Sequence, residues 1–182
     1  MRLLVKVPGA VLWLFRPEPA VERNLAREAR RRGVDPRRLV FAERLTLDEH
    51  LARHRLADLF LDTFTYNAHT TASDALWAGL PLVTKTGRGF PARVAASLLT
   101  TLGLSELITP SVQDYEALAL ALATDPGRLN AIKAKLLEAR AAAPLFDTER
   151  FARVLEDAYA RAYDRWFQGD APGPIEIAAR QP

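Results

Sequence analysis

The chain has 182 residues and a formal net charge of +3, and 49% of its residues are hydrophobic. These values are typical of one globular domain with a helical addition. The absence of cysteine excludes disulfides and thiolate metal sites and fits a cytoplasmic protein. No apolar run approaches the roughly 20 residues of a membrane helix, and residues 1–9 lack the apolar core of a signal peptide, so no membrane partner is expected.

Short apolar runs alternate with helical patterns along the first 110 residues. The apolar runs predict strands at residues 11–15, 38–42, 59–61, 81–84 and 106–109. The helical patterns predict helices at residues 18–32, 48–55, 70–79 and 91–102. The first strand is continuously apolar, so burial on both faces is expected. Alternation of this kind predicts an α/β fold with a Rossmann-like, doubly wound and mostly parallel sheet.

Several arginines gather within the first predicted helix and just after it. They are Arg23, Arg27, Arg30, Arg31, Arg32, Arg37 and Arg38. Such a cluster is compatible with phosphate or nucleic-acid binding. It is also compatible with a solvated helix face on which Glu22 and Glu28 act as ion-pair partners. No aromatic stacking platform accompanies the arginines, which favours the solvated face, and no nucleic-acid partner is expected.

After residue 110 the strand patterns end and only helical patterns remain. They predict helices at residues 112–123, 128–141 and 148–167. The last helix carries an apolar stripe of Phe151, Leu155, Ala158, Tyr159, Ala162 and Trp166. We therefore expect a sheet domain over residues 1–125, C-terminal helices over 126–168 that pack on it, and a loose tail over 169–182.

The polar residues that best suit an anion follow the third predicted strand. A loop at residues 63–69 leads into a helix that opens on His69, Thr70 and Thr71. Ligands of doubly wound sheets bind beyond the carboxyl ends of the strands, and a helix N-terminus offers free N–H groups to a phosphate. Asp74 lies one turn further, where it could accept from ribose hydroxyls. The spacing leaves a second interpretation open, in which Thr70 is only an N-cap and His69 a loop residue.

Five further residues attract attention by their type or place. His50 follows the loop after the second strand and could reach the same crevice, but a surface histidine explains its position as well. His54 is expected at the surface. Asp62 ends the third strand and is expected to cap the next loop, as a structural rather than a catalytic residue. Trp77 and Phe90 are predicted to be packing residues.

The segment NAHTTASDALWAGLPLVT, residues 67–84, resembles the NGHTT–D–LWAG–P–VT segment of the O-GlcNAc transferase family, glycosyltransferase family 41. Further similar segments lie at residues 11–16, 93–97, 102–104, 106–108 and 144–146, of which the first resembles the family's VLWLLR strand. The resemblance covers residues 7–169. A motif this long and ordered is specific, unlike a single short pattern.

This resemblance implies the C-terminal, nucleotide-sugar-binding half of a GT-B glycosyltransferase, in which two Rossmann-like halves enclose the donor. The implied reaction transfers GlcNAc from UDP-GlcNAc to Ser or Thr hydroxyls of proteins, with inversion and without a metal or other cofactor. The resemblance further implies that His69, Thr70 and Thr71 hold the diphosphate and stabilise it as the leaving group. The general base is not identifiable in this chain.

By the same resemblance, Asp74 contacts the ribose and His50 stacks on the uracil, with Arg53 close to that base. The family has a lysine three residues before this histidine, where it helps to hold the ribose, but Leu47 occupies that position here. A related transferase with another donor, GDP-fucose, is therefore an alternative.

The family also has parts upstream of its VLWLLR strand: a strand and loop with an essential lysine, an N-terminal catalytic half, and TPR-type repeats that recruit protein substrates. This chain begins with residues 1–6, which resemble the helix that follows that loop. A doubly wound sheet that lacks its central first strand leaves the neighbouring strands unpaired. We therefore expect the chain to need these parts as partners and to be inactive alone, or else to be a non-catalytic nucleotide-sugar-binding module.

Overall fold

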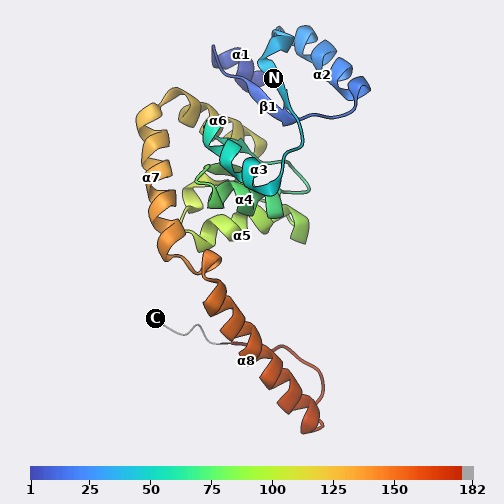
Figure 1. The fold of residues 1–182 in the computed structure, drawn as a ribbon, viewed down its shortest axis with the longest axis vertical. Helices are drawn as coiled ribbons and strands as arrows, with labels where there is room; N and C mark the ends of the chain where they lie inside the picture. The colour runs from blue at the N-terminus through green and yellow to red at the C-terminus, as the bar shows by residue number, and fades with distance from the viewer. Residues whose placement is uncertain (178–182) are drawn as a thin grey trace.

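The computed structural model describes residues 1–177 and shows an α/β fold with a long helix projecting from it (Figure 1). The strands are β1 (Leu12–Phe15), β2 (Leu39–Ala42), β3 (Phe60–Leu61), β4 (Leu82–Lys85) and β5 (Ile108–Thr109). The α-helices are α1 (Arg2–Lys6), α2 (Pro19–Arg31), α3 (Leu47–Arg53), α4 (Thr70–Trp77), α5 (Val94–Thr101), α6 (Val112–Thr124), α7 (Pro126–Ala142) and α8 (Thr148–Phe167). The predicted alternation of strands and helices is confirmed.

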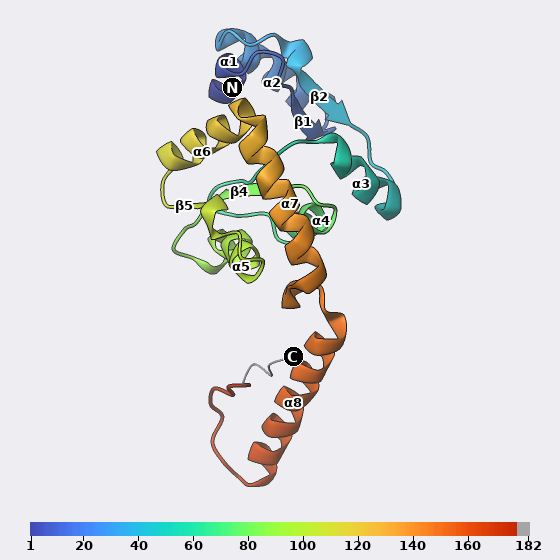
Figure 2. The same ribbon diagram turned by 90° about the vertical axis from the view of Figure 1, so that its left-hand side faces the viewer.

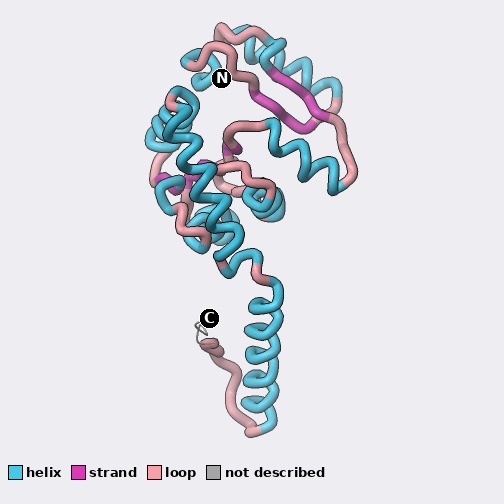
Figure 3. The backbone as a smooth tube through the Cα atoms, turned by 60° about the vertical axis from the view of Figure 1, so that its left-hand side comes forward, coloured by secondary structure: helices cyan, strands magenta, loops and turns pink. Residues whose placement is uncertain are grey.

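All the strand pairs are parallel, as the sequence predicts. β1 pairs with β2 in one sheet, and β4 lies between β3 and β5 in the other. Within residues 1–177, no ladder joins β1 to β3, and Figure 3 shows the two sheets apart. β1 and β3 therefore each have one edge without a strand partner among the described residues.

The two sheets have separate apolar cores. The larger core lies between β4 and the helices around it, where Leu76, Leu82, Leu99, Leu122 and Leu136 are all buried. The smaller core joins the residues Leu4, Ala29, Val34 and Leu39, which come from α1, α2, the turn after it and β2. The larger core therefore holds the elements that flank β3 and β4.

The expected burial of the first strand on both faces is wrong. Val11 is 56% exposed and Phe15 is 62% exposed, although Leu12 packs against the smaller core. A continuous apolar run indicates that a strand can be buried on both faces, but burial also needs covering elements. β1 has a ladder only with β2, and the smaller core covers only part of this two-stranded sheet.

The C-terminal helices differ in how they pack. Leu129, Ile132 and Leu136 of α7 are buried against the larger core, whereas no residue of α8 is buried. Figures 1 and 2 show α8 extending away from the rest of the chain. The expectation that this last helix packs on the domain is therefore wrong, and its predicted apolar stripe, Trp166 included, faces solvent.

The segment after α8 has no helix or strand up to residue 177, as predicted. It is less loose than expected, because Arg161 and Arg165 donate to the carbonyl oxygens of Glu176 and Ala171. The remaining residues of the predicted tail, 178–182, lie outside the described residues. Across the part of the chain that is described, no helix is long and apolar enough to cross a membrane.

Candidate functional site

The N-terminus of α4 presents polar groups at the carboxyl end of β3. His69 is the N-cap residue, and the amides of Ala72 and Ser73 both donate to its carbonyl oxygen at 3.1 Å. The amides of Thr70 and Thr71 precede these first helical hydrogen bonds and lie at the positive end of the helix dipole. Both threonines are exposed, and they border a depression of about 440 Å³ lined by residues 60–63 and 66–71.

The imidazole of His69 is held by neighbours on two sides. The Tyr66 ring stacks on it at a centroid distance of 4.9 Å, and the Phe90 ring meets it edge-on at 6.0 Å. Its Nε2 lies 3.4 Å from the carbonyl oxygen of Pro91. The imidazole is therefore oriented beside the helix N-terminus before any ligand binds.

Tyr66 was missed by the sequence reasoning. Its place three residues before His69, in a loop rich in small and polar residues, was the available signal. Phe90 was predicted to be a packing residue, and this is wrong, because its side chain is 78% exposed. Trp77 does pack in part, against Phe146 at a ring distance of 5.1 Å.

Asp62 organises the loop that leads to His69. Its Oδ1 accepts hydrogen bonds from the amides of Thr63 at 2.8 Å and of Ala68 at 2.7 Å. Its Oδ2 accepts from the hydroxyl of Thr84 at 2.6 Å. These contacts agree with the predicted loop-capping role of this residue.

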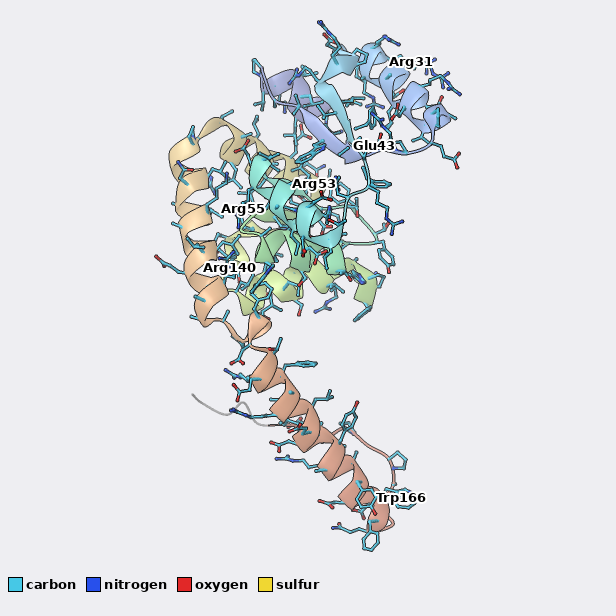
Figure 4. All side chains as sticks on the ribbon, viewed as in Figure 1. Arg31, Glu43, Arg53, Arg55, Arg140 and Trp166 are labelled. Atoms are coloured by element: carbon cyan, nitrogen blue, oxygen red, sulfur yellow. The ribbon has the colours of Figure 1, made fainter. Side chains whose placement is uncertain are left out.

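Arg53 and His50 form a second group of polar residues on α3. The Arg53 Nη2 lies 2.7 Å from His50 Nδ1, and its Nη1 donates to the carbonyl oxygen of Glu43 at 2.7 Å. The guanidinium also lies 5.8 Å from the centre of the Trp13 ring. Because a guanidinium can only donate, His50 Nδ1 is the acceptor and the ring proton lies on Nε2. Figure 4 labels Arg53 on α3.

His50 favours the neutral form at neutral pH. Partial burial lowers the pKa of its imidazole, and the charges of His54 and Arg53 lower it further, while Asp74 acts in the opposite direction. His69, Thr70 and Thr71 line the depression at the start of α4, whereas His50, Arg53 and Asp74 are not among its lining residues.

His54 is buried, at 8% exposure, and its expected surface position is wrong. Its Nδ1 lies 2.7 Å from the carbonyl oxygen of His50, and the two rings meet edge-to-face at 4.6 Å. α3 ends at Arg53 and tightens into the 3₁₀ turn His54–Leu56. The spacing of four residues from His50, which places both on one helix face, was the signal for this contact.

The solvated interpretation of the arginine cluster agrees with the structure. Arg32 forms an ion pair with Glu28 at 2.6 Å, and Arg37 forms one with Asp35 at 2.6 Å. Glu22 pairs instead with Arg16, at 3.1 Å. Over residues 1–177, no three His, Asp or Glu side chains are grouped so as to hold a metal ion.

Comparison with known proteins identifies close relatives of this chain. The sequence profile of the family described as Glycosyl transferase family 41 matches residues 1–155. The UDP-N-acetylglucosamine--peptide N-acetylglucosaminyltransferase of Caenorhabditis elegans is 37% identical over 93% of this chain and 15% of its own length. The probable UDP-N-acetylglucosamine--peptide N-acetylglucosaminyltransferase SEC of Arabidopsis thaliana is 37% identical over 96% of this chain and 18% of its own length.

Solved structures give the same result. A variant of the O-GlcNAc transferase of Thermobaculum terrenum superposes with a TM-score of 0.81 at 33% sequence identity. The match covers 88% of this chain and 31% of that protein. The chain therefore has the fold of one part of these proteins, and spans less than a fifth of the length of the two sequence relatives.

Proposed function

The chain belongs to glycosyl transferase family 41, and we propose that it supplies the donor-binding half of an enzyme that transfers GlcNAc from UDP-GlcNAc to Ser or Thr hydroxyls of proteins. The observation that carries this proposal is the anion-binding geometry at the start of α4. The amides of Thr70 and Thr71, their hydroxyls and the oriented imidazole of His69 converge on one exposed depression. Such a site suits a diphosphate.

In this proposal the residues at the helix N-terminus stabilise the leaving group. Negative charge on the diphosphate grows as the bond to the sugar breaks, and oriented N–H groups stabilise that charge without a further reorganisation. His69, Thr70 and Thr71 would donate to the diphosphate oxygens. None of them is assigned as the general base, and no metal or other cofactor enters the proposal.

The nucleoside of the donor would lie between α3 and α4. His50 offers a flat, neutral imidazole for stacking on the uracil, since burial lowers its pKa. Arg53 orients that ring through Nδ1 and lies close to the same base. Asp74 would accept hydrogen bonds from the ribose. Leu47, at the start of α3, cannot supply the charge of the lysine found there in the family, so GDP is included as a competing ligand in the test.

The acceptor protein, the remaining catalytic half and TPR-type repeats are proposed as partners that complete the reaction. The support is the small share of the relatives' length that this chain spans. We expect the chain alone to bind the donor and not to transfer the sugar. The cytoplasmic location expected from the cysteine-free sequence is part of the same proposal.

The direct test is isothermal titration of the chain with UDP and, separately, with GDP. Binding of UDP that is lost in His69→Ala and in His50→Ala supports the proposal. Two matched variants control for nonspecific effects: Thr100→Ala removes an exposed hydroxyl of α5, and Arg55→Ala removes an exposed charge next to α3. Both should bind UDP as the unchanged chain does.

Three results would contradict the proposal. Tighter binding of GDP than of UDP would point to a different donor. Equal loss of binding in the control variants would show that the titration reports on stability rather than on the site. No UDP binding by a folded chain would show that these residues do not form a donor site without further parts of the enzyme.

A further inference from the structure

Asp62 stands out among the residues to which the proposed reaction assigns no role. Its side chain is only 3% exposed, and its carboxylate accepts hydrogen bonds from the following loop and from β4. Burial raises the pKa of this carboxyl group, while the hydrogen bonds from Ala68, Thr84 and Thr63 act to lower it. Burial of a carboxylate costs free energy of folding unless hydrogen bonds compensate it. The hydrogen bonds of Asp62 therefore indicate what its burial achieves.

The hydrogen bonds of the carboxylate join the two ends of a loop. Oδ1 accepts from the amide of Thr63, at the start of the loop, and from the amide of Ala68, at its end. Ala68 is the residue immediately before His69. One carboxylate oxygen therefore links the two ends of the loop by hydrogen bonds, and the end at Ala68 adjoins His69, the N-cap of α4.

The sheet behind the loop fixes the carboxylate itself. The Thr84 hydroxyl donates to Oδ2 from the middle of β4. The Tyr115 hydroxyl of α6 donates to the main-chain oxygen of Asp62 at 3.0 Å. These partners are buried, so Asp62 transmits the position of the rigid sheet to the exposed loop.

The loop also has contacts of its own: the Thr63 hydroxyl donates to the Tyr66 carbonyl oxygen at 2.6 Å, and the Asn67 side-chain amide donates to the Thr63 carbonyl oxygen at 2.9 Å. The residues from Thr63 to Tyr66 are exposed, and Thr65 has a φ of 65°, in the left-handed region that disfavours a threonine. Asn67 is the exception, because it is buried and its amide donates to the Pro91 carbonyl oxygen at 2.8 Å. The bond from the Ala68 amide to Asp62 lies directly beside His69, so loss of the carboxylate would release this end of the loop.

We propose that Asp62 is a positioning residue of the donor site: its carboxylate closes the loop 63–68 and so holds His69 and the amides of Thr70 and Thr71 where the diphosphate binds. This inference rests on the proposed function. Asp62 itself does not touch the donor. Its effect reaches the ligand through Ala68, which is covalently joined to His69.

The test compares three variants of the full chain: Asp62→Ala, Asp62→Asn and Thr109→Val. The alanine removes the acceptor, whereas the asparagine keeps an acceptor oxygen and removes the charge. Thr109→Val is the matched control, because it deletes a buried hydroxyl of β5 that donates to the Thr84 carbonyl oxygen and makes no hydrogen bond to Asp62. Each variant is examined by amide hydrogen exchange at Asn67 and by titration with UDP.

Asn67 is the informative amide because its own acceptor is Pro91, so exchange there reports on the shape of the loop. In Asp62→Ala we expect UDP affinity to fall about tenfold, which corresponds to a loop closed about a tenth of the time, since affinity scales with the closed fraction. Exchange at Asn67 scales with the open fraction and should therefore rise by at least about tenfold. In Asp62→Asn we expect about a threefold change in each, because hydrogen bonds to a neutral acceptor are weaker. Thr109→Val should change neither.

The inference is overturned if the aspartate variants retain the exchange rate of Asn67, or if Thr109→Val loses UDP affinity to the same degree. Should Asp62→Ala not fold, the comparison of Asp62→Asn with Thr109→Val decides. Should the unchanged chain bind no UDP, the proposed function fails, while exchange at Asn67 still shows whether Asp62 orders the loop.

Discussion

Replacement of Thr84 by valine probes the buried hydrogen bond that supports Asp62. The change keeps the shape of the side chain and removes the hydroxyl that donates to Asp62 Oδ2 at 2.6 Å. Thr84 is fully buried, so water cannot replace the donor without rearrangement of the sheet. A hydrogen bond to a charged group contributes roughly 1.5–3 kcal/mol, against about 1 kcal/mol for a neutral pair.

We therefore expect Thr84→Val to lower the free energy of unfolding by about 2 kcal/mol at pH 7. Thr109→Val, which removes a hydroxyl from a neutral carbonyl oxygen, should lower it by about 1 kcal/mol. Urea denaturation followed by circular dichroism measures both. With a slope of roughly 2 kcal/mol per molar urea, the midpoint of Thr84→Val should fall by about 1 M and that of Thr109→Val by half as much.

The loss caused by Thr84→Val should also depend on pH. Burial raises the pKa of Asp62 above 3.8. The contribution of this group to the free energy of unfolding is therefore fully present below pH 3.8 and is lost as pH rises through its folded pKa. Removal of the Thr84 donor raises the folded pKa further, so the loss should be larger at pH 7 than at pH 4. Equal losses in the two valine variants at pH 7, or no decrease in acid, would refute this reasoning.

Gly87→Ala should lower the thermal midpoint and broaden the turn before the 3₁₀ segment Phe90–Ala92, because its methyl carbon would lie 2.5 Å from Cβ of Ala92. Glu116→Gln should weaken the contact of α1 with α6. The hydrogen bond from Lys6, followed by that from Arg2, holds the pKa of Glu116 below its usual value. The contribution of Glu116 to the free energy of unfolding is therefore present above pH 4.5 and is lost as pH falls through its folded pKa. Between pH 7 and pH 3, the thermal midpoint of the variant should fall less than that of the unchanged chain. The imidazole of His50 should titrate below pH 6.5 in NMR spectra, and a midpoint at or above 6.5 would contradict the burial argument.

Several elements of the fold were predictable because their signals are local. Pro19 begins α2, Gly33 follows its end with a φ of 71°, and α8 spans the predicted residues 148–167. The loop and helix around His69 were also predicted, since a polar loop after an apolar strand marks the ligand edge of a parallel sheet. These signals depend on neighbours in sequence and require no knowledge of the rest of the chain.

Burial was harder to predict, because it depends on which distant segments cover a side chain. Phe90 and the stripe on α8 are apolar and exposed, whereas His54 is polar and buried. An amphipathic pattern indicates which face of a helix can pack, but α8 meets no surface that buries it. His54 is buried because the chain tightens after Arg53, which the local pattern did not indicate.

The amino-acid sequence alone was sufficient for the family and the parallel α/β class, because a long ordered motif and the alternation of strands and helices are local signals; the residues assigned to the donor stay a prediction. The tertiary structure alone revealed the burial of His54, the exposure of Phe90 and the distant donors that hold Asp62. Each of these depends on groups far apart in the chain. The hydrogen bond from Thr84 to Asp62 crosses 22 residues and that from Tyr115 crosses 53, and no local pattern carries information about contacts over such distances.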